Sequence, residues 1–162
     1  MTDKKENKPE LSEILQLVSF KIGAGEFGVD ILKVQEINNM RVITRIPNTP
    51  DYIEGVINLR GAVIPIIDLR KRMGMMNTEA TKDTRIIVLE ISGKTIGFIV
   101  DGVKEVLRIP ANIIEPPPAL VGGISSEYIT GVGKLEDRLL LLLDLEKIVD
   151  ISFEMRTDLL AS

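Results

Sequence analysis

The chain contains an internal repeat, and this repeat limits the folds that it can adopt. When the sequence is shifted by 76 residues, the segment 51–73 aligns without a gap on the segment 127–149, with eight identities in 23 positions. Unrelated segments of ordinary composition would share about one or two residues. The identities are Tyr52/Tyr128, Ile53/Ile129, Gly55/Gly131, Val56/Val132, Leu59/Leu135, Asp68/Asp144, Leu69/Leu145 and Lys71/Lys147.

A second, fainter match lies upstream of the first in both copies. A shift of 69 residues aligns 17–37 with 86–106, and the apolar positions of the two segments coincide. The identities are Ile22/Ile91, Gly28/Gly97, Val34/Val103 and Glu36/Glu105. Because both matches occur in the same order, the sequence predicts two strand-rich units of about 70 residues, each with about five short strands. Strands in so short a unit must curl or close to hide their edges, which favours a pair of small barrels.

Local patterns predict two hairpins and two short helices. Apolar runs on either side of small-residue turns predict hairpins over 16–31 and 85–100. An Asp at an N-cap position opens each predicted helix, over 68–73 and 144–149.

Two glycines at equivalent positions of the repeat, Gly55 and Gly131, interrupt predicted strands. A glycine inside a strand marks a bulge or a bend where the strand turns a barrel corner. We therefore expect the two glycines to occupy equivalent backbone sites with matching dihedral angles.

The residues that the chain lacks exclude several classes of active site. The sequence contains no Cys, His or Trp, which excludes a disulfide framework, Cys/His zinc sites, thiol catalysis and a Ser-His-Asp triad. A net charge of −4 and an aromatic content of 4% argue against a surface that binds nucleic acid. Asp68 and Asp144 invite comparison with an aspartic-protease dyad, but their places before helical turns favour capping. We therefore predict no catalytic residue, no metal site and no cofactor.

One predicted hairpin tip carries a charge whose counterpart in the repeat has the opposite sign. The segment 58–61 lies between two apolar runs, which predicts a tight, exposed turn at Arg60. The same two positions in the second copy are Glu136 and Asp137. Charges at the rim of a surface select partners, so the two tips suit different partners. A solvated turn of arbitrary charge is the alternative.

Four segments together resemble the CheW family of chemotaxis coupling proteins. They are EFGVDILKVQEI (26–37), TRIPNTPDYIEGVINLRGAVIPIIDL (44–69), GFIVDGVKEVLRI (97–109) and SSEYITGVGKLEDRLLLLLDLEKI (125–148). The resemblance implies an all-β fold, mostly β with short helices, made of two packed five-stranded SH3-like barrels that arise from the internal duplication. No receiver, ATP-binding or phosphotransfer segment accompanies these motifs, so a stand-alone coupling protein fits best.

The resemblance implies a non-catalytic adaptor of bacterial chemotaxis. The family bridges the cytoplasmic tips of methyl-accepting chemoreceptors to the regulatory domain of the histidine kinase CheA and helps to build the signalling array. The positions that match those used for partner contact are Val34, Glu36, Gly55, Arg60, Val63, Gly97, Val103 and Val106. The hairpin with Arg60 would face one kinase or receptor surface, and an apolar groove between the barrels, with Val103 and Val106 at its wall, would accept a receptor helix. Matched apolar residues such as Val34 and Val103 also suit the core of a duplicated barrel.

The remaining expectations concern boundaries, location and rival functions. We expect a flexible N-terminal tail at 1–13, a single domain at 14–153 with subdomains of about 14–82 and 83–153 that can intertwine, and a C-terminal tail at 154–162. The charged N-terminus lacks the apolar region of a signal peptide, and the longest apolar runs are far shorter than a membrane span. We therefore expect a cytoplasmic protein that is recruited to chemoreceptor arrays without inserting into the membrane. The rivals are a small-ligand barrel, an aspartic-type enzyme and an RNA-binding pair of SH3-like barrels.

Overall fold

The computed structural model describes residues 13–76, 79–121 and 124–149. The strands are β1 (Ile14–Ile22), β2 (Gly25–Asp30), β3 (Val34–Asn39), β4 (Ile53–Leu59), β5 (Ala62–Asp68), β6 (Arg85–Ile91), β7 (Lys94–Val100), β8 (Gly102–Pro110), β9 (Ile114–Glu115), β10 (Leu120–Val121), β11 (Ile124–Ser125), β12 (Ile129–Lys134) and β13 (Leu139–Leu143). The helical turns are η2 (Ile31–Lys33), α2 (Leu69–Arg72), η3 (Ala111–Ile113), η4 (Ser126–Tyr128) and α3 (Leu145–Ile148). The predicted hairpins, now β1–β2 and β6–β7, and the predicted helices, now α2 and α3, are confirmed.

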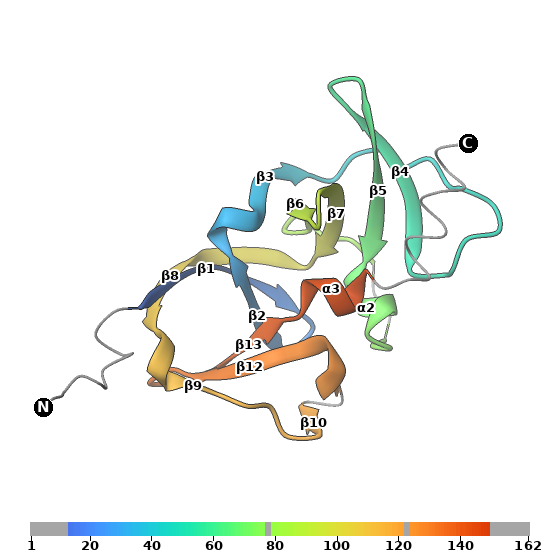
Figure 1. Cartoon of the computed structure of the whole chain (residues 1–162). Helices are drawn as coiled ribbons and strands as arrows, with labels where there is room; N and C mark the ends of the chain where they lie inside the picture. Colours follow the sequence, from blue (N-terminus) through green and yellow to red (C-terminus); the bar gives the residue numbers. More distant parts are fainter. Residues whose placement is uncertain (1–12, 77–78, 122–123, 150–162) are drawn as a thin grey trace, which may run out of the picture.

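Apart from the short ribbon β10–β11, these strands form two sheets that lie one above the other in Figure 1. We define barrel one as the five-stranded sheet with the order β3-β6-β7-β5-β4, in the upper part of the figure. Barrel two is the six-stranded sheet with the order β8-β1-β2-β13-β12-β9, in the lower part. The predicted all-β fold of two SH3-like barrels is confirmed, and the two-residue strand β9 is an addition to the five strands expected in barrel two.

The repeat is visible in the strand order. The shifts of 69 and 76 residues convert the order β3-β6-β7-β5-β4 of barrel one into the order β8-β1-β2-β13-β12 of barrel two. The register of the parallel contact is also kept, since Ile66 lies opposite Gly97 in barrel one and Leu142 lies opposite Gly28 in barrel two. Each barrel is therefore one copy of the same architecture.

The two halves of the chain exchange hairpins. The hairpin β1–β2 comes from the first half and completes barrel two, whereas β6–β7 comes from the second half and completes barrel one. The predicted subdomains, about 14–82 and 83–153, thus each contribute strands to both barrels. The predicted tails, 1–13 and 154–162, lie outside the described residues apart from Glu13.

One hydrophobic core joins the two barrels. Phe20 and Phe27 of barrel two pack in the same cluster as Ile87 and Phe98 of barrel one, and each of the four is 1% exposed or less. Fully burying a large apolar side chain stabilises the fold by about 1.5–3 kcal/mol. Separating the barrels would expose many such side chains, so the barrels fold as one unit.

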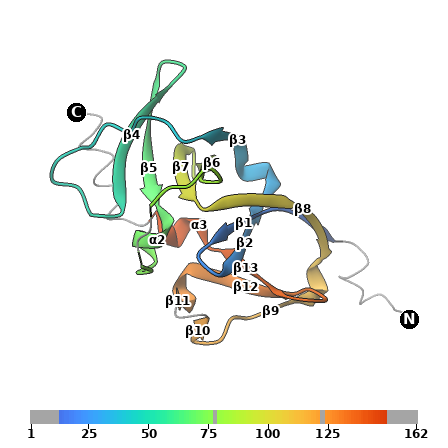
Figure 2. The same cartoon turned by 180° about the vertical axis from the view of Figure 1, so that it is seen from behind.

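Arg72 fixes the two short helices together at the boundary between the barrels. In both views α2 and α3 lie side by side there (Figures 1 and 2). Arg72 in α2 donates from Nε to the carbonyl oxygen of Ile148 at 2.9 Å and from Nη2 to that of Lys147 at 3.2 Å. Its guanidinium carbon lies 4.7 Å from the ring centroid of Tyr52 and 5.0 Å from that of Tyr128. Because these tyrosines are repeat equivalents, Arg72 holds the two copies together where they meet.

Both helices begin at the predicted Asp caps. The carboxylate of Asp68 accepts hydrogen bonds from the N–H groups of Arg70 at 3.0 Å and Lys71 at 3.4 Å. The carboxylate of Asp144 accepts one from the N–H of Lys147 at 3.2 Å. Burial is the main reason why the pKa of Asp68 lies above its ordinary value. Capping therefore explains the recurrent Asp residues.

Gly55 and Gly131 lie at the same bulge in their barrels. In each barrel the antiparallel register shifts immediately before the glycine, so the predicted bulges are confirmed. The predicted match of backbone angles is wrong, because φ is +147° at Gly55 and is not positive at Gly131. A Cβ atom on Gly55 would lie 2.1 Å from the carbonyl oxygen of Thr44, whereas one on Gly131 would lie 2.5 Å from Cγ2 of Ile114. The backbone at Gly55 is thus shaped by a neighbouring backbone, and that at Gly131 by a side chain.

Candidate functional site

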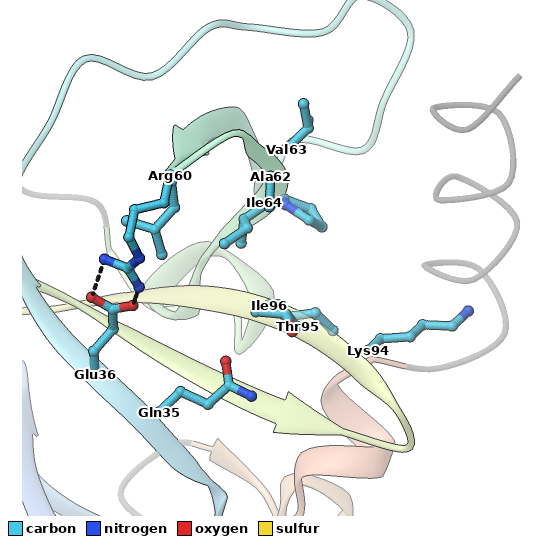
Figure 3. Close-up of a pocket in the computed structure, with 11 residues that line it drawn as sticks. Gln35, Glu36, Arg60, Ala62, Val63, Ile64, Lys94, Thr95 and Ile96 are labelled. Atoms are coloured by element: carbon cyan, nitrogen blue, oxygen red, sulfur yellow. Dashed lines mark hydrogen bonds and ion pairs between the residues drawn. The ribbon is translucent and has the colours of Figure 1, made fainter.

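Three of the eight predicted contact residues line one hollow at the end of barrel one. The hollow has a volume of about 610 Å³, and we name it the barrel-one mouth. Glu36 reaches it from β3, and Arg60 and Val63 reach it from the hairpin β4–β5 (Figure 3). Buried side chains, including Ile64 and Ile96, also line it, while Val63 is 66% exposed. The fold thus brings a charged pair and an exposed apolar side chain together.

A two-residue turn places Arg60 at the tip of the hairpin β4–β5, which projects at the top of Figure 1. The φ angles are +52° at Arg60 and +88° at Gly61, as the tightest hairpin turns require. The N–H of Gly61 donates to Oδ1 of Asn58 at 2.8 Å, which supports the turn. The side chain of Arg60 is 72% exposed, so the predicted exposed turn is confirmed.

Arg60 forms an ion pair with Glu36 across the open side of barrel one. Nη1 of Arg60 lies 3.4 Å from Oε1 of Glu36, and Nη2 donates to Oε2 (Figure 3). Glu36 belongs to the edge strand β3, and Arg60 follows β4 at the opposite edge of the sheet. The hydrogen bond from Arg60 holds the pKa of Glu36 below its ordinary value, and the same bond raises the pKa of Arg60. Exposed ion pairs contribute little to folding, so this pair suits a role in partner contact better than a structural one.

Barrel two carries an equivalent ion pair that the sequence analysis missed. Glu105, the repeat equivalent of Glu36, accepts a hydrogen bond from Nη2 of Arg138 at 3.0 Å. Arg138 also donates from Nε to Glu26 at 2.6 Å and from Nη1 to Asp137 at 3.0 Å. The predicted reversal of charge at the second tip is therefore incomplete, because the arginine lies two residues further along in this copy. The repeated glutamate was the available signal, since a matching glutamate calls for a matching cation.

Two of the predicted valines lie on β8 and face the joint core. A shift of register between β1 and β8 places Val103 opposite Phe20 and Val106 opposite Val18. Phe20 and Val18 belong to the core between the barrels. The bulge therefore puts Val103 and Val106 on one face of the strand despite their odd spacing.

The valines differ in how deeply they are buried. Val34, on the edge strand β3, and Val103 are partly buried and pack against the joint core. Val106 remains 54% exposed, and its repeat equivalent Ile37 is 42% exposed. In both views η2 lies between β3 and β8, and its Leu32 is 88% exposed. We name the three exposed side chains Leu32, Ile37 and Val106 the apolar edge strip.

The two predicted glycines act through the fold. A Cβ atom on Gly97 would lie 2.6 Å from Cδ1 of Ile66 and 3.0 Å from Cγ2 of Ile86. Gly55 has the close contact with Thr44 described above. Both positions require the missing side chain for close packing. The candidates that reach the surface are therefore the two charged residues and the two exposed valines.

The chemistry available at the barrel-one mouth is ion pairing, hydrogen bonding and apolar contact. Among the described residues, no group of three or more acidic side chains is placed to hold a metal ion. Within the same ranges, no helix is long and apolar enough to cross a membrane.

Comparisons with known proteins identify the family. The family model described as the CheW-like domain matches residues 16–152. This chain belongs to the CheW family. The chemotaxis protein CheW of Klebsiella aerogenes is 44% identical over 134 residues, which are 83% of this chain and 81% of that protein. The chemotaxis protein CheW of Bacillus subtilis is 35% identical over 135 residues, 83% of this chain and 86% of that protein.

A solved structure supports the same assignment. The crystal structure of the scaffolding protein TtCheW from Thermoanaerobacter tengcongensis superimposes with a TM-score of 0.81 at 40% identity, and the match covers 87% of this chain and 96% of that one. The resemblance seen in the sequence is confirmed. The family is one of chemotaxis scaffold and adaptor proteins.

Proposed function

We propose that this protein is a non-catalytic adaptor that couples the cytoplasmic tips of chemoreceptors to the histidine kinase CheA and helps to form the signalling array. The barrel-one mouth is the observation that carries the proposal, because Glu36, Arg60 and Val63 meet there at an open hollow. Membership of a chemotaxis scaffold family supports the same role. The protein would work in the cytoplasm and be recruited to receptor arrays at the membrane.

The composition of the barrel-one mouth suits recognition of a protein surface. A guanidinium offers several N–H donors in a planar fork, and Glu36 occupies only part of the fork of Arg60. Val63 supplies apolar area beside it, and interfaces gain affinity where an arginine and an apolar contact are desolvated together. We assign this mouth to the regulatory domain of CheA.

The apolar edge strip suits a different kind of partner. Leu32, Ile37 and Val106 expose large apolar side chains along the edge of the joint core. An amphipathic helix binds such a strip through residues spaced along one of its faces. We assign this strip to the receptor. Two separate surfaces would allow both partners to bind at once, which is what coupling requires.

The test compares variants of Arg60 with a matched control. Arg45 has a side chain that is 74% exposed and pairs with Glu54 at 3.5 Å, but it does not line the barrel-one mouth. We expect Arg60→Ala to leave the melting temperature nearly unchanged and to weaken binding to the CheA regulatory domain by about tenfold or more, measured by calorimetry. Arg60→Lys should restore part of the affinity, because lysine cannot form a two-pronged contact. Arg45→Ala should change neither quantity.

Two results would contradict this assignment. Unchanged CheA binding by a folded Arg60→Ala variant would make Arg60 a solvated turn residue. A large fall in its melting temperature would mean that the ion pair with Glu36 is structural.

A further inference from the structure

The end of barrel two repeats the end of barrel one. A hollow of about 490 Å³ is lined there by β2, β8, the start of β13 and the turns beside them. Leu139 and Leu141 in this hollow are the equivalents of Val63 and Pro65 in the barrel-one mouth. Glu26 is likewise the equivalent of Thr95. We name this second hollow the barrel-two mouth.

An exposed apolar side chain marks both mouths at the same place. Leu139 is 52% exposed, and its equivalent Val63 is 66% exposed. Leu141 lies beside Leu139 in the hollow and is 6% exposed. A partner that covered Leu139 would remove apolar area from water, and this burial is favourable. The duplication has thus kept an apolar contact point at the end of each barrel.

The charges around the barrel-two mouth fall into a fixed group and a free group. Arg138 is bound by the carboxylates of Glu26, Glu105 and Asp137 at 2.6 to 3.0 Å, so its charge is balanced within the protein. Glu26 is 8% exposed and is the one charged residue that the described part of the chain buries. This group braces the mouth in the way that Glu36 and Arg60 brace the other one.

Two lysines form the free group. Lys21 lines the mouth, and within residues 13–76, 79–121 and 124–149 it has no ion-pair partner. Lys104 also lines it, and its Nζ lies 3.7 Å from Oε1 of Glu26, at the limit of an ion pair. Both side chains are exposed. Their ammonium groups are therefore available to carboxylates of a partner, next to the apolar surface of Leu139.

We propose that the barrel-two mouth is a second docking site, which binds a short acidic segment of a partner protein that also carries an apolar side chain. The lysines bind the carboxylates, and Leu139 packs against the apolar side chain. A small inorganic anion would satisfy the lysines but would leave Leu139 exposed. The site would give the adaptor a partner contact at the end of each barrel, beyond the CheA and receptor contacts proposed above.

The test is a titration of the full-length protein, labelled with nitrogen-15, with a short acetylated and amidated peptide that alternates glutamate with leucine. We expect the amide signals of Gly25, Lys104 and Leu139 to shift, and the shifts to weaken with added salt. The same peptide with lysine in place of glutamate should leave them unmoved. The double variant Lys21→Glu with Lys104→Glu should weaken binding about tenfold.

Matched variants separate this site from the barrel-one mouth. Leu139→Ser should reduce binding of the acidic peptide at these amides, whereas Val63→Ser, the same change at the equivalent position, should not. A dispersed spectrum shows in each case that the variant is folded. The proposal is overturned by three outcomes: no shifts at the barrel-two mouth, equal shifts from inorganic phosphate, or binding only to vesicles of anionic lipid. These outcomes leave the Arg60 experiment unaffected, so the two proposals can fail separately.

Discussion

Alanine at Gly55 should destabilise the fold much more than alanine at Gly131, although the two positions are repeat equivalents. At Gly55 the φ angle is +147°, and holding a side chain in such a sparsely populated region costs about 1–3 kcal/mol. The new Cβ would also lie 2.1 Å from the carbonyl oxygen of Thr44. Thr44 is held by two backbone hydrogen bonds with Val56, both 2.9 Å long, and each contributes about 1 kcal/mol. The total is about 3–5 kcal/mol.

At Gly131 the obstacle is softer. Its Cβ would meet Cγ2 of Ile114 at 2.5 Å, and φ is not positive there. A side chain can rotate away at a cost of about 0.5–1.5 kcal/mol. We therefore expect a loss of about 1–2 kcal/mol at Gly131.

Thermal unfolding and urea titration of the two single variants measure the difference. In a domain of this size about 1 kcal/mol lowers the melting temperature by about 2–4 °C, so Gly55→Ala should fall by about 10 °C and Gly131→Ala by about 4 °C. CheA binding by Gly55→Ala should fall only in proportion to the folded fraction, because the glycine presents no side chain to a partner. Equal losses of stability at the two sites, or a larger loss at Gly131, would refute the reasoning from backbone contacts.

Three further predictions follow from the packing. Arg72→Met removes the donors to the carbonyl oxygens at the end of α3, so it should cost about 2 kcal/mol and change the fluorescence of the two tyrosines; an unchanged melting temperature would contradict the bridge. For Glu26, burial raises the pKa but hydrogen bonds and charges led by Arg138 outweigh it, so the folded pKa lies below the unfolded value of about 4.3. Its stabilising effect is therefore present at neutral pH and lost as the pH falls, so the melting temperatures of wild type and Glu26→Gln should converge in acid, and a constant gap would contradict this. Fragments 1–78 and 79–162 should refold only when mixed, because the halves exchange hairpins; independent folding of either, seen by circular dichroism, would contradict that.

The sequence predicted the local elements well because each rests on short-range chemistry. Small-residue turns specify the hairpins, and Asp68 and Asp144 specify the helix starts through their caps. The turn at Arg60 follows from the Arg-Gly pair, which accepts two positive φ angles in succession. The repeat also fixes which strands are equivalent, so it predicts two similar barrels.

The exchange of hairpins was not predictable, because it is a long-range choice. A hairpin such as β1–β2 has the same apolar pattern and the same repeat equivalents whether it joins its own half or the other one. The role of Arg138 was hidden for a related reason. Its repeat equivalent is Ala62, so alignment alone does not connect it with Arg60. The difference in φ between Gly55 and Gly131 depends on which segment crosses each bulge, and this too is set by tertiary packing.

The most direct test of the adaptor role is sedimentation of a ternary mixture. A soluble chemoreceptor cytoplasmic fragment, CheA and this protein are combined at equal concentration, with each pair as a control. The account predicts a complex that contains all three, in which CheA sediments with the receptor to a much greater extent when the wild-type protein is present, and much less with Arg60→Ala or Val106→Asp. A protein that binds neither partner, or that leaves the sedimentation of CheA with the receptor unchanged, would contradict the account.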